Sequence, residues 1–225
     1  MKRKVGIIGI TGKVGTILSE IIEKDTDLEL IGGTSSKSTN ADFENIAKNS
    51  DVLIDFSVQI STMQAIEVAK KFGTPFICGT TGISEENLKK IKEYSKKISI
   101  LYASNFSIAV HLMAAMLKRC SEVLSGYDIS IIDKHHKSKR DAPSGTSLFL
   151  AKQLKKEAQM LSVRSGNIPA EMICDFCGED DMLTISHRAF GRTVFAKGAV
   201  ACAKWIIGKK SGMYSMEDYI GDQQQ

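Results

Sequence analysis

A short cationic segment is the part of the chain best suited to acid–base chemistry. Residues 134–140 contain four lysine or arginine side chains and two histidines, His135 and His136. The pKa of an unperturbed histidine is about 6.5, so its side chain can move protons near neutral pH. The lysine and arginine side chains add positive charge that can attract an anion. A run of charges is more often a solvated surface, so the residues that follow have to decide the interpretation.

Those residues predict an anion-binding helix start. Pro143-Ser144-Gly145-Thr146 precedes a stretch with apolar residues at helical spacing. The free N–H groups of a helix N-terminus, together with the Ser144 and Thr146 hydroxyls, favour a bound carboxylate. Lysines on one side and a helix start on the other would hold a small substrate with two carboxylates.

A glycine-rich turn near the N-terminus predicts a dinucleotide site. Gly9, Gly12 and Gly15 follow an apolar run at residues 5–8 and precede helical spacing over residues 14–22. Glycines allow a sharp turn, close approach of a pyrophosphate to the backbone, and tight packing of helix on strand. The Gly-x-x-Gly-x-x-Gly spacing departs from the usual Gly-x-Gly-x-x-Gly. The strand before it and the helix after it favour the dinucleotide site over an ordinary glycine turn.

The end of the second expected strand bears on the choice of dinucleotide. A carboxylate often binds the ribose hydroxyls there, but residues 34–37 read Thr-Ser-Ser-Lys. The hydroxyl of Ser36 and the ammonium of Lys37 tolerate a 2′-phosphate that a carboxylate would repel. The loop therefore favours NADPH, with use of both NADPH and NADH left open.

Three further turns follow expected strands, at residues 55–57, 79–82 and 103–106. Ligands of an open parallel sheet bind beyond the carboxyl ends of its strands, so these turns are expected around one crevice. Each alone could be a plain turn.

The first hundred residues alternate between apolar runs and helical spacing, which predicts an α/β fold with a parallel sheet covered by helices on both faces. Strands are expected at residues 5–8, 28–31, 52–56, 75–78 and 98–103, and helices at 14–22, 61–72 and 84–96.

The rhythm changes after Asn105 and predicts a smaller α+β domain. Helices are expected at residues 108–124 and 147–161, a strand at 128–133, and antiparallel strands within 162–195. An apolar helix at 199–207 is expected to return to the first domain. Two domains with a ligand cleft between them would result.

Composition, charge and hydrophobicity exclude several classes of protein. The chain has 225 residues, 43% of them hydrophobic and 25% charged, with a net charge of +4. No stretch suits a membrane span or a signal peptide, and no strongly basic stripe predicts nucleic-acid binding. Five scattered cysteines fit a reducing cytoplasm.

A cysteine pair and the C-terminal tail are the remaining features of the sequence. Cys174 and Cys177 form a Cys-x-x-Cys pair with only His187 near in sequence. Buried thiols are expected there rather than a metal site, because structural zinc needs four ligands. Residues 223–225 resemble a frayed tail.

The cationic segment and its neighbours closely resemble one enzyme family. His135-His136-x-x-Lys139-x-Asp141-Ala142-Pro143-Ser144-Gly145-Thr146 is similar to the signature of the dihydrodipicolinate reductases. The resemblance covers nearly the whole chain in the family's order. It includes the glycine turn, residues 55–57, 79–82 and 104–107, the stretch 186–199, and the closing residues 212–216.

The resemblance implies a Rossmann-type dinucleotide domain at residues 1–106 and 196–225, and a substrate and tetramerisation domain at 107–195. It implies reduction of 4-hydroxy-tetrahydrodipicolinate to tetrahydrodipicolinate with NADPH or NADH in lysine and diaminopimelate biosynthesis. A cytoplasmic homotetramer is expected.

The resemblance also assigns roles to residues. His135 would be the catalytic acid/base and Lys139 the proton donor to the carbon skeleton. Substrate would bind at His136, Ser144, Gly145 and Thr146. The cofactor would bind at Gly9, Ile10, Thr11, Gly12, Lys13, Val14, Ser36, Lys37, Gly79, Thr80, Thr81, Ala103, Ser104, Asn105 and Phe106.

Three features depart from the family pattern. Asp133 stands where glutamate is frequent, Ser138 where a further histidine is frequent, and the region 162–185 is short, which bears on the oligomer interface. Arg192 could serve the site or a structural ion pair.

Two alternatives remain open. The first is another small dehydrogenase of the homoserine or aspartate-semialdehyde type. The second is a nucleotide-sensing protein without turnover. Replacing Lys139 separates reductase from sensor, because only a reductase would lose turnover while still binding cofactor.

Overall fold

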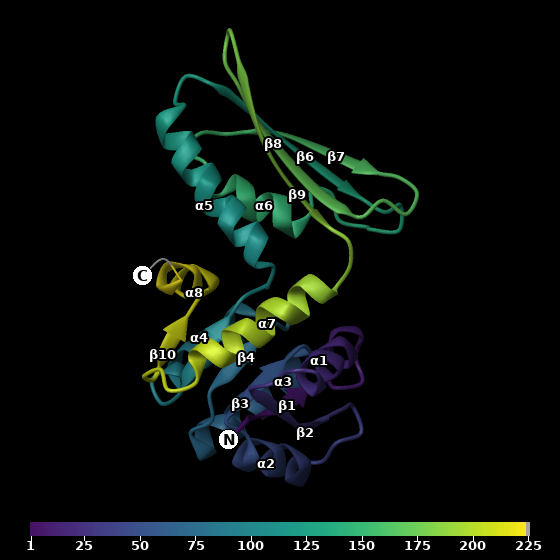
Figure 1. Ribbon diagram of the computed structural model, residues 1–225, viewed down its shortest axis with the longest axis vertical. Helices are drawn as coiled ribbons and strands as arrows, with labels where there is room; N and C mark the ends of the chain where they lie inside the picture. Colours follow the sequence, from purple (N-terminus) through teal and green to yellow (C-terminus); the bar gives the residue numbers. More distant parts are fainter. Residues whose placement is uncertain (224–225) are drawn as a thin grey trace. The chain divides into compact units, whose positions relative to one another are not determined.

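The computed structural model describes residues 1–223, so residues 224 and 225 of the expected tail lie outside the described part. The chain forms two compact units (Figure 1). Unit 1 combines Met1–Ser107 with Arg192–Gln225, and unit 2 is Ile108–Gly191. The chain thus leaves unit 1 once and returns to it.

Unit 1 is built on a six-stranded sheet with the order β10-β5-β4-β3-β1-β2. Every pairing in it is parallel. Its strands are β1 (Arg3–Ile8), β2 (Leu28–Thr34), β3 (Val52–Asp55), β4 (Phe76–Cys78), β5 (Ser99–Tyr102) and β10 (Gly212–Tyr214). β2 lies on one side of β1 and β3 on the other, so the direction of winding reverses at β1. Ligands of doubly wound sheets bind at such a reversal.

Helices cover both faces of this sheet because its strands bury alternate residues on opposite sides. Val5 and Ile7 of β1 join one hydrophobic core, whereas Ile8 joins the other. The first core includes residues of α1 (Lys13–Glu23), α7 (Thr193–Ile206) and α8 (Met216–Asp222). The second includes residues of α2 (Asn40–Asn49), α3 (Gln59–Phe72) and α4 (Glu85–Ser95). The predicted parallel sheet with helices on both faces is confirmed.

Unit 2 is a four-stranded sheet with the order β7-β6-β8-β9 and two helices. The strands are β6 (Asp128–His135), β7 (Gln159–Arg164), β8 (Ala170–Cys177) and β9 (Met182–Ala189), and the helices are α5 (Ile108–Val123) and α6 (Gly145–Ala151). β6 pairs in parallel with β7, whereas β8 pairs antiparallel with both β6 and β9. The core lies between one sheet face and the helices, where Ile131 and Phe176 meet Leu117 and Leu150.

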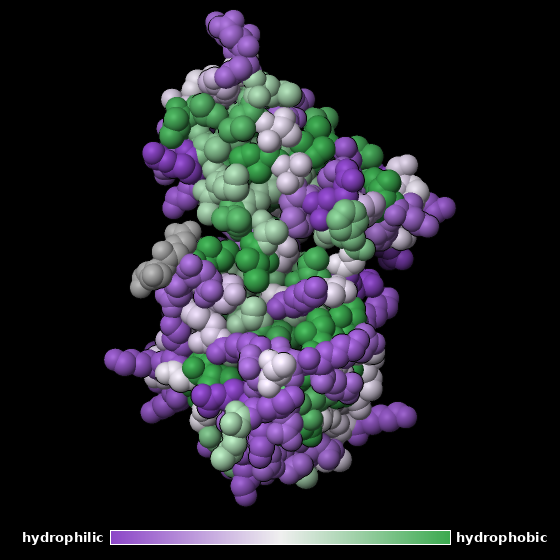
Figure 2. Space-filling model, viewed as in Figure 1, coloured by the Kyte–Doolittle hydropathy of each residue, from purple (hydrophilic) through white to green (hydrophobic). Residues whose placement is uncertain are grey.

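Apolar side chains also stay exposed on unit 2. Ile108, Leu112 and Met116, four residues apart on α5, are 37%, 47% and 45% exposed. In Figure 2 hydrophobic residues gather over the helical side of unit 2, while hydrophilic ones cover most of the visible surface of unit 1.

One predicted helix is wrong over two-thirds of its length. The helix expected at 147–161 ends at Ala151, and residues 159–164 form strand β7 instead. The charged residues Lys155, Lys156 and Glu157 offer nothing to bury, and the Lys155 N–H donates to the Ser121 hydroxyl at 2.8 Å. β7 is a sheet-edge strand, mostly exposed, so its sequence lacks the alternation that predicts a strand.

Other elements differ in extent or were not predicted. α7 begins at Thr193 rather than at 199, and residues 193–195 are therefore helical rather than part of the expected antiparallel region. The sequence did not predict α2, β10 or α8. β10 is three residues long and gains its strand character from pairing with β5.

Candidate active site

The glycine turn joins β1 to α1 in unit 1. Gly9 has a φ of +83°, a conformation that favours glycine, and the N–H groups of Gly9 and Ile10 both donate to the Thr34 carbonyl of β2. A Cβ on Gly15 would lie 2.1 Å from the Gly9 carbonyl oxygen. The helix therefore begins against the turn, with Gly12 as its N-cap. This is the close approach that a pyrophosphate-binding turn requires.

The remaining predicted residues of this turn divide by environment. Ile10 and Val14 pack against the core cluster beneath the turn. Thr11 and Lys13 are exposed. The turn thus has an apolar side that anchors it and a polar side that is accessible.

The loop after β2 lies beside the same sheet edge, because Thr34 pairs with Ile8 at the end of β1. Ser36 and Lys37 are exposed within a turn closed by the Ser38 N–H, which donates to the Ser35 carbonyl at 3.1 Å. No carboxylate occurs between residues 34 and 38.

Asp55 links the turns after β3 and β4. Its carboxylate is fully buried and accepts from Ser57 Oγ at 2.5 Å, Thr62 Oγ1 at 2.6 Å and Thr80 Oγ1 at 2.9 Å. Burial raises the pKa of Asp55, and these hydrogen bonds offset only part of that effect. Thr80 is itself 2% exposed and accepts from the Ser57 N–H at 3.0 Å. The Thr80 hydroxyl therefore links the turn after β4 to the turn after β3 through both of its hydrogen bonds.

Two phenylalanine rings connect the turns after β3, β4 and β5. A Cβ on Gly79 would lie 2.5 Å from the Phe56 ring, so that ring occupies the space where a side chain would stand. The Phe56 and Phe106 ring centroids are 5.5 Å apart. The structure thus brings together the predicted turns 55–57, 79–82 and 103–106.

The residues of the turn after β5 have different exposures. Ala103 is buried and its N–H donates to the Cys78 carbonyl at 3.1 Å. Ser104 and Thr81 are exposed, and the Asn105 side chain accepts from the Ser107 N–H at 2.8 Å. The Ser104 and Thr81 hydroxyls are therefore accessible at the carboxyl ends of the strands, where hydrogen bonds hold the backbone of the turn after β5 in place.

The cationic segment of unit 2 begins at the end of β6 and runs to α6. The Lys139 N–H donates to the His136 carbonyl at 3.1 Å, which folds the segment into a turn. Lys139 Nζ lies 2.9 Å from Asp141 Oδ1, and 23% of the Lys139 side chain is exposed. The hydrogen bond from Lys139 lowers the pKa of Asp141. His136 is exposed, with Nδ1 2.7 Å from the Ser138 hydroxyl.

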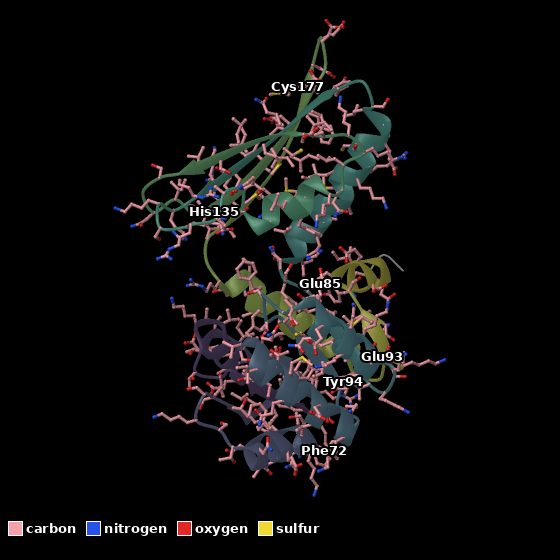
Figure 3. The ribbon with its side chains drawn as sticks, turned by 180° about the vertical axis from the view of Figure 1, so that it is seen from behind. Phe72, Glu85, Glu93, Tyr94, His135 and Cys177 are labelled. Atoms are coloured by element: carbon pink, nitrogen blue, oxygen red, sulfur yellow. The ribbon has the colours of Figure 1, made fainter. Side chains whose placement is uncertain are left out.

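His135 is buried at the end of β6 (Figure 3), with only 8% of the residue exposed. Its Nδ1 lies 2.5 Å from Asp133 Oδ1. Burial lowers the pKa of His135, the Asp133 carboxylate opposes that effect, and the charges of Lys139 and Arg164 add to it. Because Nδ1 faces Asp133, Nε2 is the ring nitrogen left to exchange protons with a ligand.

Helix α6 starts beside this histidine. Ser144 is its N-cap, with Oγ accepting from the Ser147 N–H at 3.2 Å, and is 1% exposed. Gly145 is exposed and Thr146 half-buried. The Ser144 hydroxyl is thus engaged within the protein, Gly145 is exposed at the helix start, and Thr146 is partly exposed.

Two family models match consecutive parts of the chain. Residues 3–106 match the family described as dihydrodipicolinate reductase, N-terminus, and residues 109–220 match dihydrodipicolinate reductase, C-terminus. The chain belongs to the dihydrodipicolinate reductase family.

Relatives in this family match over nearly their full length. A 4-hydroxy-tetrahydrodipicolinate reductase of Caldanaerobacter subterraneus subsp. tengcongensis is 33% identical, covering 95% of this chain and 96% of its own. The corresponding reductase of Thermosipho africanus is 31% identical over 96% of this chain and 97% of its own. That of Rickettsia peacockii is 32% identical over 95% and 97%.

Solved structures share the fold. A dipicolinate-bound dihydrodipicolinate reductase from Paenisporosarcina sp. TG-14 superposes with a TM-score of 0.83 at 21% identity, covering 98% of this chain and 100% of that one. A putative myo-inositol dehydrogenase from Sinorhizobium meliloti 1021 gives a TM-score of 0.63 at 9% identity, covering 90% and 89%. At these identities the likeness concerns the fold.

Membership of the dihydrodipicolinate reductase family implies an oxidoreductase with a nicotinamide cofactor. The glycine turn of unit 1 fits such a dinucleotide, since Gly9 has a positive φ and α1 packs so close that a Cβ at Gly15 would collide with the turn. Membership also decides against the homoserine and aspartate-semialdehyde alternatives.

Two residues that contact the cationic segment are not among those predicted from the sequence. Asp133 stands out in the sequence only as a departure from the family pattern. Arg164 lies in a segment expected to form antiparallel strands, but it ends β7, which pairs in parallel with β6. Arg164 Nη2 is 2.9 Å from Asp133 Oδ2 and 2.7 Å from the Asp141 carbonyl. The signal available for Asp133 was its position two residues before His135, which places both on one face of a strand.

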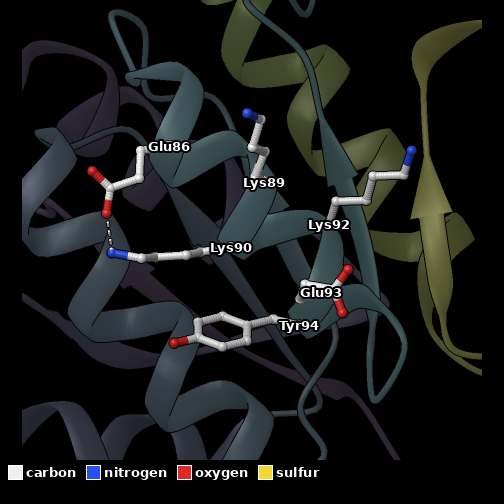
Figure 4. A pocket seen from close by; sticks show the side chains of 6 residues that line it. All are labelled: Glu86, Lys89, Lys90, Lys92, Glu93 and Tyr94. Carbon is white, nitrogen blue, oxygen red and sulfur yellow. Dashed lines mark hydrogen bonds and ion pairs between the residues drawn. The ribbon is translucent and has the colours of Figure 1, made fainter.

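A pocket on unit 1 lies apart from the predicted residues. It is lined by Glu86, Lys89, Lys90, Lys92, Glu93 and Tyr94, all from α4 (Figure 4). Lys90 Nζ is engaged with Glu86 at 2.7 Å, and Lys70 Nζ lies 4.1 Å from the centre of the Tyr94 ring. The pocket is the exposed flank of one helix and includes none of the proposed site residues.

The remaining sequence candidates lie elsewhere. Cys177 pairs with Asp128 at the far end of β6 from His135, and Figure 3 labels Cys177 and His135. Burial raises the pKa of Cys174 to about 12. Among the described residues, no group of three or more His, Cys, Asp or Glu side chains is placed to hold a metal.

Arg192 is the exposed N-cap of α7, where the chain re-enters unit 1. Within residues 1–223 no helix has the length and apolar character needed to cross a membrane.

Proposed function

We propose that this chain reduces 4-hydroxy-tetrahydrodipicolinate to tetrahydrodipicolinate in lysine and diaminopimelate biosynthesis. The reaction adds a hydride from the reduced nicotinamide and one proton to the substrate, and releases the hydroxyl as water. Family membership over both units supports this reaction. The observation that carries it is the cluster at the end of β6, where His135, Lys139 and the start of α6 lie on one loop.

His135 and Lys139 are proposed to handle protons. His135 Nε2 would exchange a proton with the substrate, because Nδ1 faces Asp133 at 2.5 Å. Lys139 would give a proton to the carbon skeleton after hydride addition. Its present partner, Asp141, is exposed, so a substrate carboxylate can compete for the ammonium group.

The start of α6 is proposed to bind a substrate carboxylate. Gly145 and Thr146 are accessible there, and the exposed His136 adds a donor nearby. Ser144 was predicted as a substrate ligand, but its hydroxyl caps α6, so we propose that it acts by fixing the helix start. The substrate's two carboxylates match the cationic character of the loop.

The cofactor is proposed to bind at the carboxyl ends of the unit 1 strands. The proposed residues are Gly9, Ile10, Thr11, Gly12, Lys13, Val14, Gly79, Thr80, Thr81, Ala103, Ser104, Asn105 and Phe106. Thr80 would contribute through its backbone, because its hydroxyl is engaged by Asp55. Exposed Ser36 and Lys37 support a preference for NADPH, with NADH as an alternative donor.

We further propose a cytoplasmic homotetramer in which residues 107–195 serve substrate binding and assembly, while residues 1–106 and 196–225 bind the dinucleotide. The sheet face of unit 2 turned away from its helices supports assembly. Leu161, Val163 and Met182 lie on it and are 44%, 40% and 63% exposed.

The deciding experiment follows reduced-nicotinamide absorbance after adding the freshly made condensation product of pyruvate and aspartate semialdehyde. We expect oxidation of NADPH that depends on both the chain and the condensation product. Cofactor binding without oxidation would instead identify a nucleotide-sensing protein. Tetrahydrodipicolinate is then identified as the product by mass spectrometry.

A further inference from the structure

A single buried carboxylate contacts both ends of the proposed proton-transfer loop. Asp133 is fully buried on β6. Its Oδ1 faces His135 Nδ1 at 2.5 Å, and its Oδ2 accepts from the Ser144 N–H at 2.6 Å. The same Oδ2 accepts from Arg164 Nη2 at 2.9 Å. One side chain thus connects the histidine, the start of α6 and the neighbouring strand.

The strand geometry explains why these contacts form. Asp133 and His135 are two residues apart on β6, so both point to the face that also bears Ile131. β7 runs parallel to β6 in a register that pairs Arg164 with His135. A long arginine side chain at that position can reach back to Asp133 and forward to the loop.

Arg164 carries the connection to the lysine. Besides the Asp133 carboxylate, its guanidinium donates to the Asp133 carbonyl at 3.0 Å and to the Asp141 carbonyl at 2.7 Å. Asp141 is the residue whose carboxylate lies 2.9 Å from Lys139 Nζ. The guanidinium therefore ties the lysine-bearing loop to the strand that ends in His135.

We propose that Asp133 and Arg164 are positioning residues that fix the ring of His135 with Nε2 toward the substrate and hold the loop of Lys139 in place. This inference rests on the proposed function. Asp133 and Arg164 need not touch substrate, because they act through His135 and Lys139, which are proposed to do so. An orienting carboxylate of this kind selects one tautomer of a catalytic histidine.

The charges around His135 make the proposal testable without turnover. They are Asp133 on the same strand, Lys139 on the loop and Arg164 on β7. Asp133→Asn removes the negative charge beside the ring, so the pKa of His135 is expected to fall further. Arg164→Gln removes a positive charge and is expected to raise the pKa of His135. Shifts of opposite sign would show that both charges act on the His135 ring, and a loss of kcat in the same variants would show that this matters for the proposed reaction.

The experiment titrates His135 by NMR in the unliganded full chain and measures kcat and KM for the same variants. The chain has four histidines, and the His135→Asn spectrum assigns the resonance. For Asp133→Asn we expect kcat to fall about 10- to 100-fold, as for other partners that orient a histidine. Arg164→Gln should lower kcat less, since Asp133 still faces the ring.

Asp175→Asn is the matched control. Asp175 lies on β8 and accepts from the Thr184 hydroxyl at 2.7 Å, away from His135. This variant should leave both the His135 titration and kcat unchanged. Circular dichroism and urea unfolding report whether each variant is folded.

The outcomes separate the two proposals. An unchanged His135 titration in folded Asp133→Asn overturns the positioning role. If Asp133→Asn does not fold, Arg164→Gln decides alone, and a His135 pKa that stays or falls overturns the role. If the titrations shift as expected but the parent does not reduce the substrate, the proposed function fails while the positioning of His135 stands.

Discussion

Two buried aspartates, one in each unit, stabilise their surroundings through different donors. Asp55 accepts from hydroxyls and a backbone N–H, and these neutral donors do not prevent burial from raising its pKa. Burial would also raise the pKa of Asp133, but hydrogen bonds from Arg164 and Ser144 outweigh it and lower the pKa. A cationic donor therefore keeps Asp133 charged beside His135, since hydrogen bonds to charged groups are the stronger ones.

Replacing either proposed proton-transfer residue should slow the chemistry. His135→Ala and Lys139→Ala are each expected to lower kcat by about 100-fold or more, the usual contribution of a positioned acid or base. Cofactor affinity, measured by fluorescence titration, should stay unchanged because neither residue belongs to unit 1. Lys137→Ala removes a charge from the same loop and should keep most of the rate. Parent-level turnover in both alanine variants contradicts the proposed roles.

The exposed lysine after β2 should select the dinucleotide. Lys37→Asp replaces an ammonium group with a carboxylate that repels a 2′-phosphate. We expect the ratio of kcat/KM for NADPH over NADH to fall about tenfold or more, since a hydrogen bond to a charged group contributes about 1.5–3 kcal/mol. Lys48→Asp makes the same charge change on the exposed side of α2 and should leave the ratio unaltered. An unaltered ratio in Lys37→Asp removes this residue from selection.

At the level of elements, close approaches between helices and turns set the geometry of unit 1. The start of α1 meets the Gly9 carbonyl at Gly15, and α7 meets the Phe106 carbonyl at Gly198, where a Cβ would lie 1.8 Å from that oxygen. Both contacts connect a covering helix to a turn at the carboxyl ends of the strands. A side chain at either glycine must therefore displace a turn proposed to bind cofactor.

Gly15→Ala should weaken both the fold and cofactor binding. The added methyl group has only backbone beside it, so we expect a loss of about 1–3 kcal/mol in the free energy of unfolding, as for other overpacked sites. Urea unfolding measures that loss, and fluorescence titration should show weaker binding of NADPH. Gly221→Ala places a methyl group in open space on α8 and should be neutral or slightly stabilising. Equal stability of both variants would show that the turn gives way easily.

On the scale of the whole molecule, the chain completes unit 1 only after building unit 2. α7 contributes Ala199, Cys202 and Ile206 to a core that α1 shares, and β10 extends the sheet beside β5. Residues from both ends of the sequence therefore have to meet before the sheet face under α1, α7 and α8 is covered. Unit 2 has its own core and one sheet face with exposed apolar side chains.

That exposed sheet face leads to a prediction about assembly. Val163→Glu places a charge on the outer face of β7 and should shift the proposed tetramer toward smaller species in light scattering. Val123→Glu is the control, since this valine is also exposed, at 61% against 40%, but lies at the end of α5. A tetramer that persists in Val163→Glu would place the interface elsewhere.

Local sequence patterns were enough to predict the parallel sheet of unit 1 and to indicate the chemistry proposed for the loop. Strands buried on both faces read as short apolar runs, so their alternation with helices predicted the parallel sheet. The two histidines, the lysines around them and the helix start predicted proton transfer near an anion site, because all of these groups lie within one short segment. Local patterns of this kind need no information about distant residues.

Tertiary structure alone decided which distant residues support that loop. β7 was missed because an exposed edge strand carries little apolar alternation, and its register with β6 is what brings Arg164 to Asp133. β10 and the early start of α7 also depend on packing against residues about a hundred positions away. Pairing partners far along the chain leave no local signal, since a strand's register is set by the sheet it joins.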